Sequence, residues 1–276
     1  FKDFKSDQEV RWCPGCGDYS VLASLQKVLP TVCEEKGIGK EKVVVVSGIG
    51  CSSRLPYYMN TYGFHSIHGR ATAIATGIKV ANPELCVWQA SGDGDALAIG
   101  GNHFIHAIRR NVDINIMLFN NQIYGMTKGQ YSPTSRLGAI TKTSPYGTVE
   151  APFNPGSLVL GAKGTFFARS MDTELALNQE IMLEASRHSG TSVMEFLVNC
   201  VIFNNGSHAE ISDRENKADR LLFLKREEKM IFGRNRDKGI VLENMKLKVV
   251  TIGQDGYTED DILTHDPSVD NLGLQT

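Results

Sequence analysis

The fold is decided by residues 85–95, LCVWQASGDGD, in which an apolar run passes directly into a turn rich in Gly and Asp. The run over 85–90 predicts a short buried strand, because apolar segments of this length bounded by turn residues are typical of parallel sheets. Ligands bind at the carboxyl ends of the strands in open parallel sheets. The turn at 92–95 therefore occupies the position where a ligand site is expected.

Strand-like and helix-like segments alternate on both sides of this stretch. Strands are expected at 43–46, 85–90, 114–119, 165–168 and 192–198, and helices at 19–29, 70–81, 99–110 and 174–187. Such an alternation predicts an α/β fold with a mostly parallel sheet and helices on both faces.

The composition excludes several classes of protein. The 276 residues, 41% apolar and 22% charged, are an ordinary globular balance for one large α/β domain or two small ones. The 29 basic and 31 acidic side chains give a net charge of -2, which argues against a nucleic-acid partner. No stretch approaches the about 20 apolar residues of a membrane span, and no export signal is recognisable. We expect a cytoplasmic protein that binds neither membrane nor nucleic acid.

The composition changes near residue 205, which predicts a main domain at 1–205 and a C-terminal extension at 206–276. Fifteen charged residues crowd between Asp213 and Lys238, so this part is expected to lie over the surface or against a partner subunit. The chain from Val249 onward has six acidic residues and no Lys or Arg, which predicts a solvated tail with one strand at 247–252.

Residue types suited to chemistry follow four of the predicted strands. They are SGIGCS at 47–52, GDGD at 92–95, NNQIYG at 120–125, and Cys200. Because the carboxyl ends of parallel strands share one edge of the sheet, these segments are expected to meet there.

The combination of GDG at 92–94 with NN at 120–121 predicts a Mg²⁺-diphosphate site. Mg²⁺ prefers oxygen ligands and takes one or two of them from the protein, and Asp93 offers a carboxylate while Asn121 offers an amide oxygen. The glycines let the backbone approach phosphate, and a helix beginning near residue 99 adds its dipole. Each piece alone is an ordinary turn, but together they match the signature of thiamine diphosphate (TPP) enzymes.

Two neighbouring motifs carry weaker signals. GIG at 48–50 could begin a dinucleotide fingerprint, but the third glycine would fall at Ser53. His68 and Arg70 open the helix predicted at 70–81, where an imidazole and a guanidinium could face a diphosphate. We assign His68 to the site, whereas a local cap or ion pair fits Arg70 equally well.

CPGC at 13–16 has three interpretations. A thioredoxin-like dithiol ought to follow a strand, yet only twelve mostly polar residues precede this one. A zinc site would need a second CxxC or a His pair. A four-thiolate iron–sulfur cluster would join the motif to Cys51 and Cys200, which follow predicted strand ends, and we prefer it. Cys33 and Cys86 are assigned to packing.

Five motifs stand along the chain in one order: CPGCG at 13–17, GIGCS at 48–52, HGRA at 68–71, GDGD at 92–95 and NNQIYGMTKGQ at 120–130. Together they resemble the β subunit of 2-oxoacid:ferredoxin oxidoreductases, most closely the 2-oxoglutarate branch. The likeness covers roughly residues 10–205 and is weaker in the extension.

The resemblance implies a TPP-binding fold in which Cys13, Cys16, Cys51 and Cys200 hold a [4Fe-4S] cluster. It assigns Mg²⁺ to Asp93, Asn121 and the backbone carbonyl of Ile123. Further cofactor contacts carry over to Ile49, Gly50, Cys51, Ser52, His68, Gly92, Gly94, Asp95, Gly125 and Met126.

In the family, a 2-oxoacid condenses with TPP and loses CO₂, electrons pass singly through the cluster to ferredoxin, and coenzyme A takes the acyl group. No glutamate follows a predicted strand end on the cofactor edge, so the glutamate that activates TPP is expected on an α subunit. Activity is therefore expected only with that partner. Arg54 is expected to hold a substrate carboxylate, although a surface role or an influence on the cluster potential fits nearly as well.

Three alternatives stay open. A pyruvate-specific or broad-specificity enzyme would share all of these motifs. A non-redox TPP decarboxylase would need no cysteine quartet, and an electron-transfer subunit would need no GDG and NN pair. Bound thiamine together with a brown colour would separate the redox enzyme from the last two.

Overall fold

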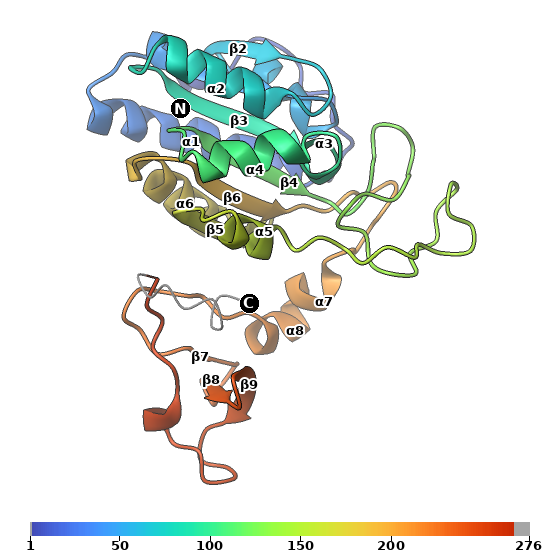
Figure 1. Cartoon of the computed structure of the whole chain (residues 1–276), viewed down its shortest axis with the longest axis vertical. Helices are drawn as coiled ribbons and strands as arrows, with labels where there is room; N and C mark the ends of the chain where they lie inside the picture. Colours follow the sequence, from blue (N-terminus) through green and yellow to red (C-terminus); the bar gives the residue numbers. More distant parts are fainter. Residues whose placement is uncertain (1, 268–276) are drawn as a thin grey trace. The chain divides into compact units, whose positions relative to one another are not determined.

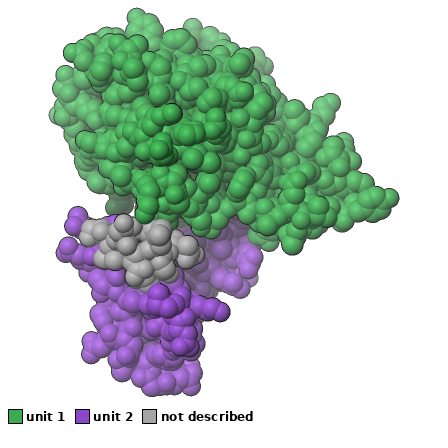
Figure 2. All heavy atoms as spheres, viewed as in Figure 1, with its two compact units in different colours: residues 1–207 green, residues 208–276 purple. Residues whose placement is uncertain are grey.

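The computed structural model describes residues 2–267, and the chain forms two compact units that divide between residues 207 and 208 (Figure 2). The first unit contains the sheet predicted from the sequence, and the second contains the C-terminal extension. None of the described helices combines the length and the apolar character that a bilayer span requires.

The first unit is built on a six-stranded sheet with the order β2-β1-β3-β4-β6-β5, in which every neighbouring pair is parallel (Figure 1). The strands are β1 (Val43–Ser47), β2 (Tyr62–His65), β3 (Cys86–Gly92), β4 (Asn115–Asn120), β5 (Phe166–Met171) and β6 (Ser192–Leu197). The prediction of an α/β fold with a mostly parallel sheet is confirmed.

Helices cover both faces of this sheet, as predicted. They are α1 (Asp18–Lys36), α2 (Ala71–Ala81), α3 (Asp93–Leu97), α4 (Gly101–Arg109), α5 (Pro155–Gly161) and α6 (Leu175–Arg187). Successive strand side chains point to opposite faces. Val43 and Val45 accordingly pack with α1 and α6 in one core, while Val44 and Val46 pack with α2 and α4 in the other.

Three local features of this unit differ from the sequence-based expectation. The helix expected at 19–29 continues through Pro30 to Lys36. A strand that was not predicted, β2, lies at the edge of the sheet, and all four of its residues are exposed. The helix expected at 99–110 is present as α4, which begins at Gly101, but a short helix that was not predicted, α3, begins at Asp93 directly after β3.

The second unit corrects the expectation of a solvated tail. After α7 (Ala209–Ser212) and α8 (Arg214–Arg220), the strands β7 (Ile231–Phe232), β8 (Lys238–Glu243) and β9 (Lys246–Thr251) form an antiparallel sheet. Its small core contains Val241, Val250 and Ile262, and Ile262 is only 3% exposed. These apolar residues are separated by charged ones, which hides the core from a composition argument.

The remaining elements are short 3₁₀ helices: η1 (Lys2–Phe4), η2 (Lys40–Lys42), η3 (Ser52–Tyr58) and η4 (Glu259–Asp261). Of these, η3 matters for the site, because it begins immediately after Cys51 at the carboxyl end of β1.

Candidate functional site

The loops that carry the predicted site leave the sheet from a single edge. Ser47 pairs with Ala90, Gly92 with Phe119, and Asn120 with Leu197, so the carboxyl ends of β1, β3, β4 and β6 lie in register. The segments that follow these strands therefore emerge beside one another, as the order of elements predicts.

Asp95, which follows β3, contacts the segments that follow β1 and β2. Its Oδ1 atom accepts hydrogen bonds from the backbone N–H groups of Ile49 (3.0 Å) and Gly69 (2.7 Å), and lies 3.1 Å from Nδ1 of His68. Burial raises the pKa of Asp95, and these donors act in the opposite direction. A Cβ atom at Gly48 would overlap the Asp95 carboxylate, so glycine is required there. Asp95 thus braces the loops at 48–52 and 68–70.

Asp93 is buried at the first position of α3, with 2% of its surface exposed. Its Oδ2 atom accepts hydrogen bonds from Ser132 Oγ and Thr134 Oγ1, both at 2.5 Å. Burial raises the pKa of Asp93 to about 6 even though these hydroxyls lower it. Sequence reasoning missed Ser132 and Thr134, since the only signal was a cluster of hydroxyl residues shortly after the NN motif.

The NN motif forms a tight turn after β4. Asn121 Oδ1 accepts a hydrogen bond from the Ile123 backbone N–H at 3.0 Å, and Gln122 has the left-handed φ of 57°. Tyr124 then donates from its hydroxyl to the Gly94 carbonyl at 2.9 Å. A Cβ at Gly94 would overlap the Tyr124 ring, so this glycine allows the two loops to close on each other. Burial raises the pKa of Tyr124 to about 12.

Four cysteines come together at the same edge from three segments. Burial raises the pKa of Cys51 to about 11, and the nearby Asp18, Cys200 and Cys13 add to this rise. Burial likewise raises the pKa of Cys16, with Cys51 and Cys200 among the contributing neighbours. All six cysteines of the chain are free thiols.

Gly125 lies against this thiol group. A Cβ atom on Gly125 would come 3.4 Å from Cys200 Sγ and 3.7 Å from Cys51 Sγ. The loop that carries the Asn121 turn therefore passes directly beside two of the four sulfurs. Met126, the next residue, is exposed.

Trp12 and Asp18 are further residues at the thiols that sequence reasoning missed. The Trp12 indole N–H donates to the Cys51 carbonyl at 2.7 Å and so fixes the backbone of that cysteine. Asp18 is buried, and its pKa is raised to about 7 by burial and by the neighbouring Asp172. Neither residue belongs to a motif that sequence analysis recognises. Trp12 directly precedes CPGC, and Asp18 follows it.

Cys33 and Cys86 lie apart from the quartet, in α1 and β3. Both pack in the core on the α1 face of the sheet, as predicted. Arg54 lies on η3 with an exposed side chain, and its charge lowers the pKa of Cys51. Arg70 is the residue before α2 and donates to the carbonyl of Ile99, in the segment between α3 and α4, at 3.3 Å.

The donors present at this edge fit two kinds of metal group. The carboxylate of Asp93, the amide of Asn121 and the carbonyl of Ile123 are oxygen donors of the type Mg²⁺ prefers. Ser52 Oγ is buried and makes no hydrogen bond within residues 2–267, although it adjoins Gly92, so a polar ligand group would satisfy it. Among the described residues, no three His, Cys, Asp or Glu side chains are grouped closely enough to hold a metal ion. Cys51 interacts electrostatically with Cys13, Cys16 and Cys200, so the four thiols lie near one another.

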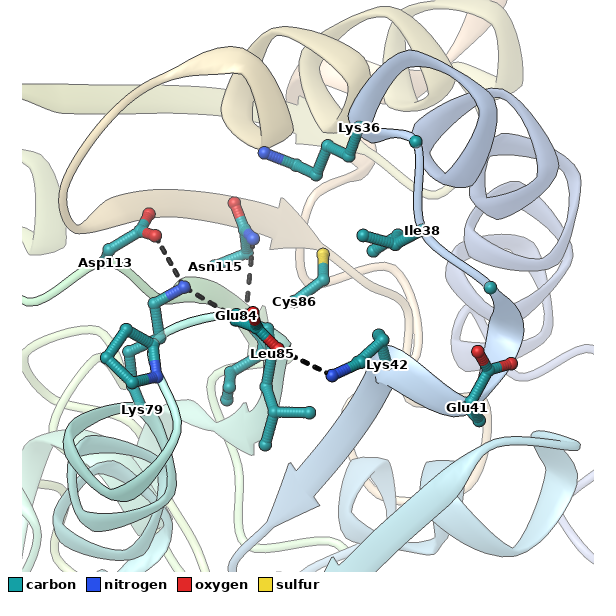
Figure 3. Close-up of a pocket in the computed structure, with 14 residues that line it drawn as sticks. Lys36, Ile38, Glu41, Lys42, Lys79, Glu84, Leu85, Cys86, Asp113 and Asn115 are labelled. Carbon is teal, nitrogen blue, oxygen red and sulfur yellow. Dashed lines mark hydrogen bonds and ion pairs between the residues drawn. The ribbon is translucent and has the colours of Figure 1, made fainter.

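Two cavities lie near the sheet. One of about 590 Å³ is at the amino ends of β1, β3 and β4, opposite the candidate site. Figure 3 shows its ion pairs, in which Lys79 Nζ meets Asp113 Oδ2 at 2.7 Å and Lys42 Nζ meets Glu84 Oε2 at 2.8 Å. Two of its lysines and two of its carboxylates are therefore paired with one another.

The second cavity, of about 550 Å³, borders Ile123 and lies between the loops that follow β4 and β6. Its charged lining residues are Lys128, Arg136 and Lys142, and the residues that line it include no carboxylate. This cavity is suited to an anion.

Comparisons with known proteins agree with this geometry. The family model described as thiamine pyrophosphate enzyme, C-terminal TPP binding domain, matches residues 38–196. The fold and the site thus define a thiamine pyrophosphate-binding domain.

Two similar proteins indicate which group of thiamine pyrophosphate-binding proteins the chain resembles. The chain is 50% identical over 270 residues to the 2-oxoglutarate oxidoreductase subunit KorB of Mycobacterium tuberculosis, covering 98% of this chain and 70% of the relative. It is 48% identical to the 2-oxoglutarate synthase subunit KorB of Archaeoglobus fulgidus, covering 68% of this chain and 69% of the relative.

A solved structure agrees with these relatives. The 2-oxoglutarate:ferredoxin oxidoreductase from Magnetococcus marinus, with 2-oxoglutarate, coenzyme A and succinyl-CoA bound, matches with a TM-score of 0.70 and 43% identity, covering 74% of this chain and 69% of that one. The chain therefore belongs to the β subunits of the 2-oxoacid:ferredoxin oxidoreductases, in the KorB group.

Proposed function

We propose that this chain is the cofactor-carrying subunit of an enzyme that oxidatively decarboxylates 2-oxoglutarate, with coenzyme A as acyl acceptor and ferredoxin as electron acceptor. The observation that carries this proposal is the position of Gly125. This one residue connects the Asn121 turn to two sulfurs of the cysteine quartet, so a diphosphate site and a thiol site adjoin through a single loop. The names of the similar proteins support the choice of substrate and acceptor.

Asp93, Asn121 and the Ile123 carbonyl would hold Mg²⁺ with the diphosphate of TPP. The Asx turn fixes Asn121 Oδ1 against the Ile123 backbone N–H, and two hydroxyl donors hold the Asp93 carboxylate. Ser52 Oγ and the imidazole of His68 would face the cofactor, with His68 oriented by Asp95. When bound, TPP stabilises the carbanion that decarboxylation leaves.

Cys13, Cys16, Cys51 and Cys200 would hold a [4Fe-4S] cluster. Burial of Cys16 and Cys51 disfavours their free thiolates, as their raised pKa values indicate, so the positive charge of iron is what would stabilise these ionised sulfurs. A cluster accepts one electron at a time, which suits transfer to ferredoxin.

The residues of this chain leave the acid–base part of the chemistry incomplete. Glu195 lies in the middle of β6 and is engaged by Arg169 and Asn120, and Glu174 follows the edge strand β5 at the start of α6. We infer that an α subunit supplies the glutamate that activates TPP. On the C-terminal unit, the exposed Leu247 and Val249 of β9 offer an apolar strip for packing on that subunit.

The anionic character of the substrate agrees with the charges near the site. 2-Oxoglutarate carries two carboxylates, and the cavity beside Ile123 presents Lys128, Arg136 and Lys142. Arg54 is a further cation close to Cys51. We place the enzyme in the cytoplasm, since its six free thiols suit a reducing compartment.

A panel of 2-oxoacids tests this function. The chain would be purified anaerobically with its α subunit and assayed with coenzyme A and an artificial one-electron acceptor. We expect the highest kcat/KM for 2-oxoglutarate, with pyruvate and 2-oxobutyrate well below it. CO₂ release without reduction of the acceptor would point to a non-redox decarboxylase, and a preference for pyruvate would move the chain to another branch of the family.

A further inference from the structure

A series of close polar contacts links Arg169, near the surface of the sheet, to Asp93. Arg169 Nε donates to Glu195 Oε2 at 2.7 Å, and Glu195 Oε1 accepts from Asn120 Nδ2 at 2.7 Å. Thr134 Oγ1 contacts Asn120 Oδ1 at 2.9 Å and Asp93 Oδ2 at 2.5 Å. Four of these five residues lie on or directly after the strands β3, β4, β5 and β6, whereas Thr134 lies in the irregular segment after β4.

Glu195 determines the orientation of the Asn120 side-chain amide. Because the Glu195 carboxylate accepts only, Asn120 must turn its NH₂ group toward it, which leaves Asn120 Oδ1 facing Thr134. Thr134 has one hydroxyl proton and two acceptors within reach. The shorter contact to the Asp93 carboxylate is the charge-assisted one, so the proton belongs there.

The segment that carries Thr134 is itself rigid. Ser135 donates from its backbone N–H to the Ser132 carbonyl at 3.0 Å, and its hydroxyl donates to the Gln122 carbonyl at 2.7 Å. The Pro133 carbonyl accepts from the Phe153 backbone N–H at 2.8 Å. Ser132 and Thr134 are 2% and 3% exposed, so solvent does not compete for their hydroxyls.

We propose that Thr134, with Ser132, is a positioning residue for the metal-binding carboxylate. The two hydroxyls occupy Asp93 Oδ2 and fix the rotation of the carboxylate, so that Oδ1, which neither hydroxyl contacts, keeps a constant direction toward a divalent ion. Hydrogen-bond partners of metal ligands orient those ligands, and their loss typically weakens metal binding about ten- to hundredfold. This inference rests on the proposed Mg²⁺-TPP site.

Three variants test the role of the Thr134 hydroxyl. Thr134→Val removes the hydroxyl and keeps the shape, and Thr134→Ser restores it. Thr191→Val is a matched control, because Thr191 is 1% exposed and its hydroxyl donates to the Ala107 and Val112 carbonyls at the far edge of the sheet. Each variant would be prepared as the complex with its α subunit and stripped of TPP and metal. Calorimetry would then give the Mg²⁺ dissociation constant at saturating TPP, and heating would give the Tm.

We expect Thr134→Val to weaken Mg²⁺ binding about tenfold relative to Thr191→Val, with Thr134→Ser within about threefold of wild type. At saturating Mg²⁺, the TPP affinity of Thr134→Val should recover, which general damage to the fold would not allow. A Mg²⁺ affinity for Thr134→Val no weaker than that of Thr191→Val would overturn the proposal. If Thr134→Val does not fold, Ser132→Ala serves as the second probe with the same criteria.

The wild-type titration separates this inference from the function on which it rests. A wild-type complex that binds no Mg²⁺-TPP would refute the proposed function. A wild-type complex that binds it, with a Mg²⁺ affinity for Thr134→Val no weaker than that of Thr191→Val, would refute only the positioning role.

Discussion

The Asp95 carboxylate and the Gly69 backbone amide lie 2.7 Å apart, although they belong to segments that follow different strands of the sheet. The same oxygen of Asp95 also accepts from Ile49. One buried carboxylate therefore fixes the loops at 48–52 and 68–70 relative to the start of α3. This role does not require Asp95 to contact a cofactor.

Replacing Asp95 should test this bracing role. Asp95→Ala leaves two buried amides without an acceptor, so we expect the free energy of unfolding to fall by about 2–4 kcal/mol. Asp95→Asn keeps an acceptor oxygen and should lose less. Urea denaturation measures both. The control Asp113→Ala removes the half-exposed partner of Lys79 and should cost at most about 1 kcal/mol; equal losses in the Asp95→Ala and Asp113→Ala variants would contradict the bracing role.

The cysteine quartet predicts a colour and an iron content. Anaerobically purified protein should show broad visible absorbance and about four irons per chain, as a four-thiolate [4Fe-4S] site requires. Cys13→Ser should abolish both signals. Cys33→Ser and Cys86→Ser should keep them, because these thiols pack in the core on the α1 face. An equal loss of iron in Cys86→Ser would refute the assignment.

Asp93→Ala should abolish Mg²⁺-dependent TPP binding while the fold persists. The variant removes the only charged oxygen donor among the three proposed Mg²⁺ ligands. Without this carboxylate, the site should not bind Mg²⁺. Calorimetric titration of the complex with TPP in the presence of Mg²⁺ provides the measurement, with Asp113→Ala as the control at the opposite edge of the sheet. TPP binding at wild-type affinity would remove Asp93 from the site.

The isolated chain should be inactive. Its described glutamates near the site are engaged elsewhere, Glu195 in an ion pair with Arg169 and Glu174 at the start of α6. An assay of the purified chain with 2-oxoacid, coenzyme A and a one-electron acceptor should give no turnover until the α subunit is added. Turnover of any 2-oxoacid by the chain alone would show that the activating group is in this chain.

Arg54→Ala should distinguish a substrate contact from an effect on the thiols. If Arg54 holds the second carboxylate of the substrate, kcat/KM for 2-oxoglutarate should fall about ten- to hundredfold, as expected for one charge-assisted contact, with little change for pyruvate. Arg11→Ala is the control, since Arg11 is an exposed partner of Glu9. Equal losses for both acids would assign Arg54 to Cys51, whose pKa it lowers.

The sequence was sufficient to predict the sheet and the edge that carries the site, because both depend on local patterns. Apolar runs fixed the buried strands, and motifs placed immediately after them had only one edge to occupy. The strand β2 was not predicted, because its four residues include no continuous apolar run like those of the buried strands.

The partners of Asp93 were beyond prediction for a different reason. Ser132 and Thr134 are 39 and 41 residues away from it, and they reach it from a segment without regular structure, so no period relates them. The hydrogen bond from the Trp12 indole N–H likewise reaches a backbone carbonyl, that of Cys51, far away in the sequence. Such contacts follow from tertiary packing, which a single sequence does not encode in its spacing.

The strand order also determines when the parts of the site can be completed during synthesis. Within the described sheet, β5 pairs with β6 and with no other strand, and β6 lies between β4 and β5. Residues 166–171 must therefore leave the ribosome and wait for residues 192–197 before they can join the sheet. Arg169 and Glu195 are partners in that final pairing, and Cys200 lies three residues beyond the end of β6. The Arg169–Glu195 ion pair and the fourth thiol thus arrive at the same late step of chain growth, so the residues proposed to bind the two metal groups come together only after β6 has inserted.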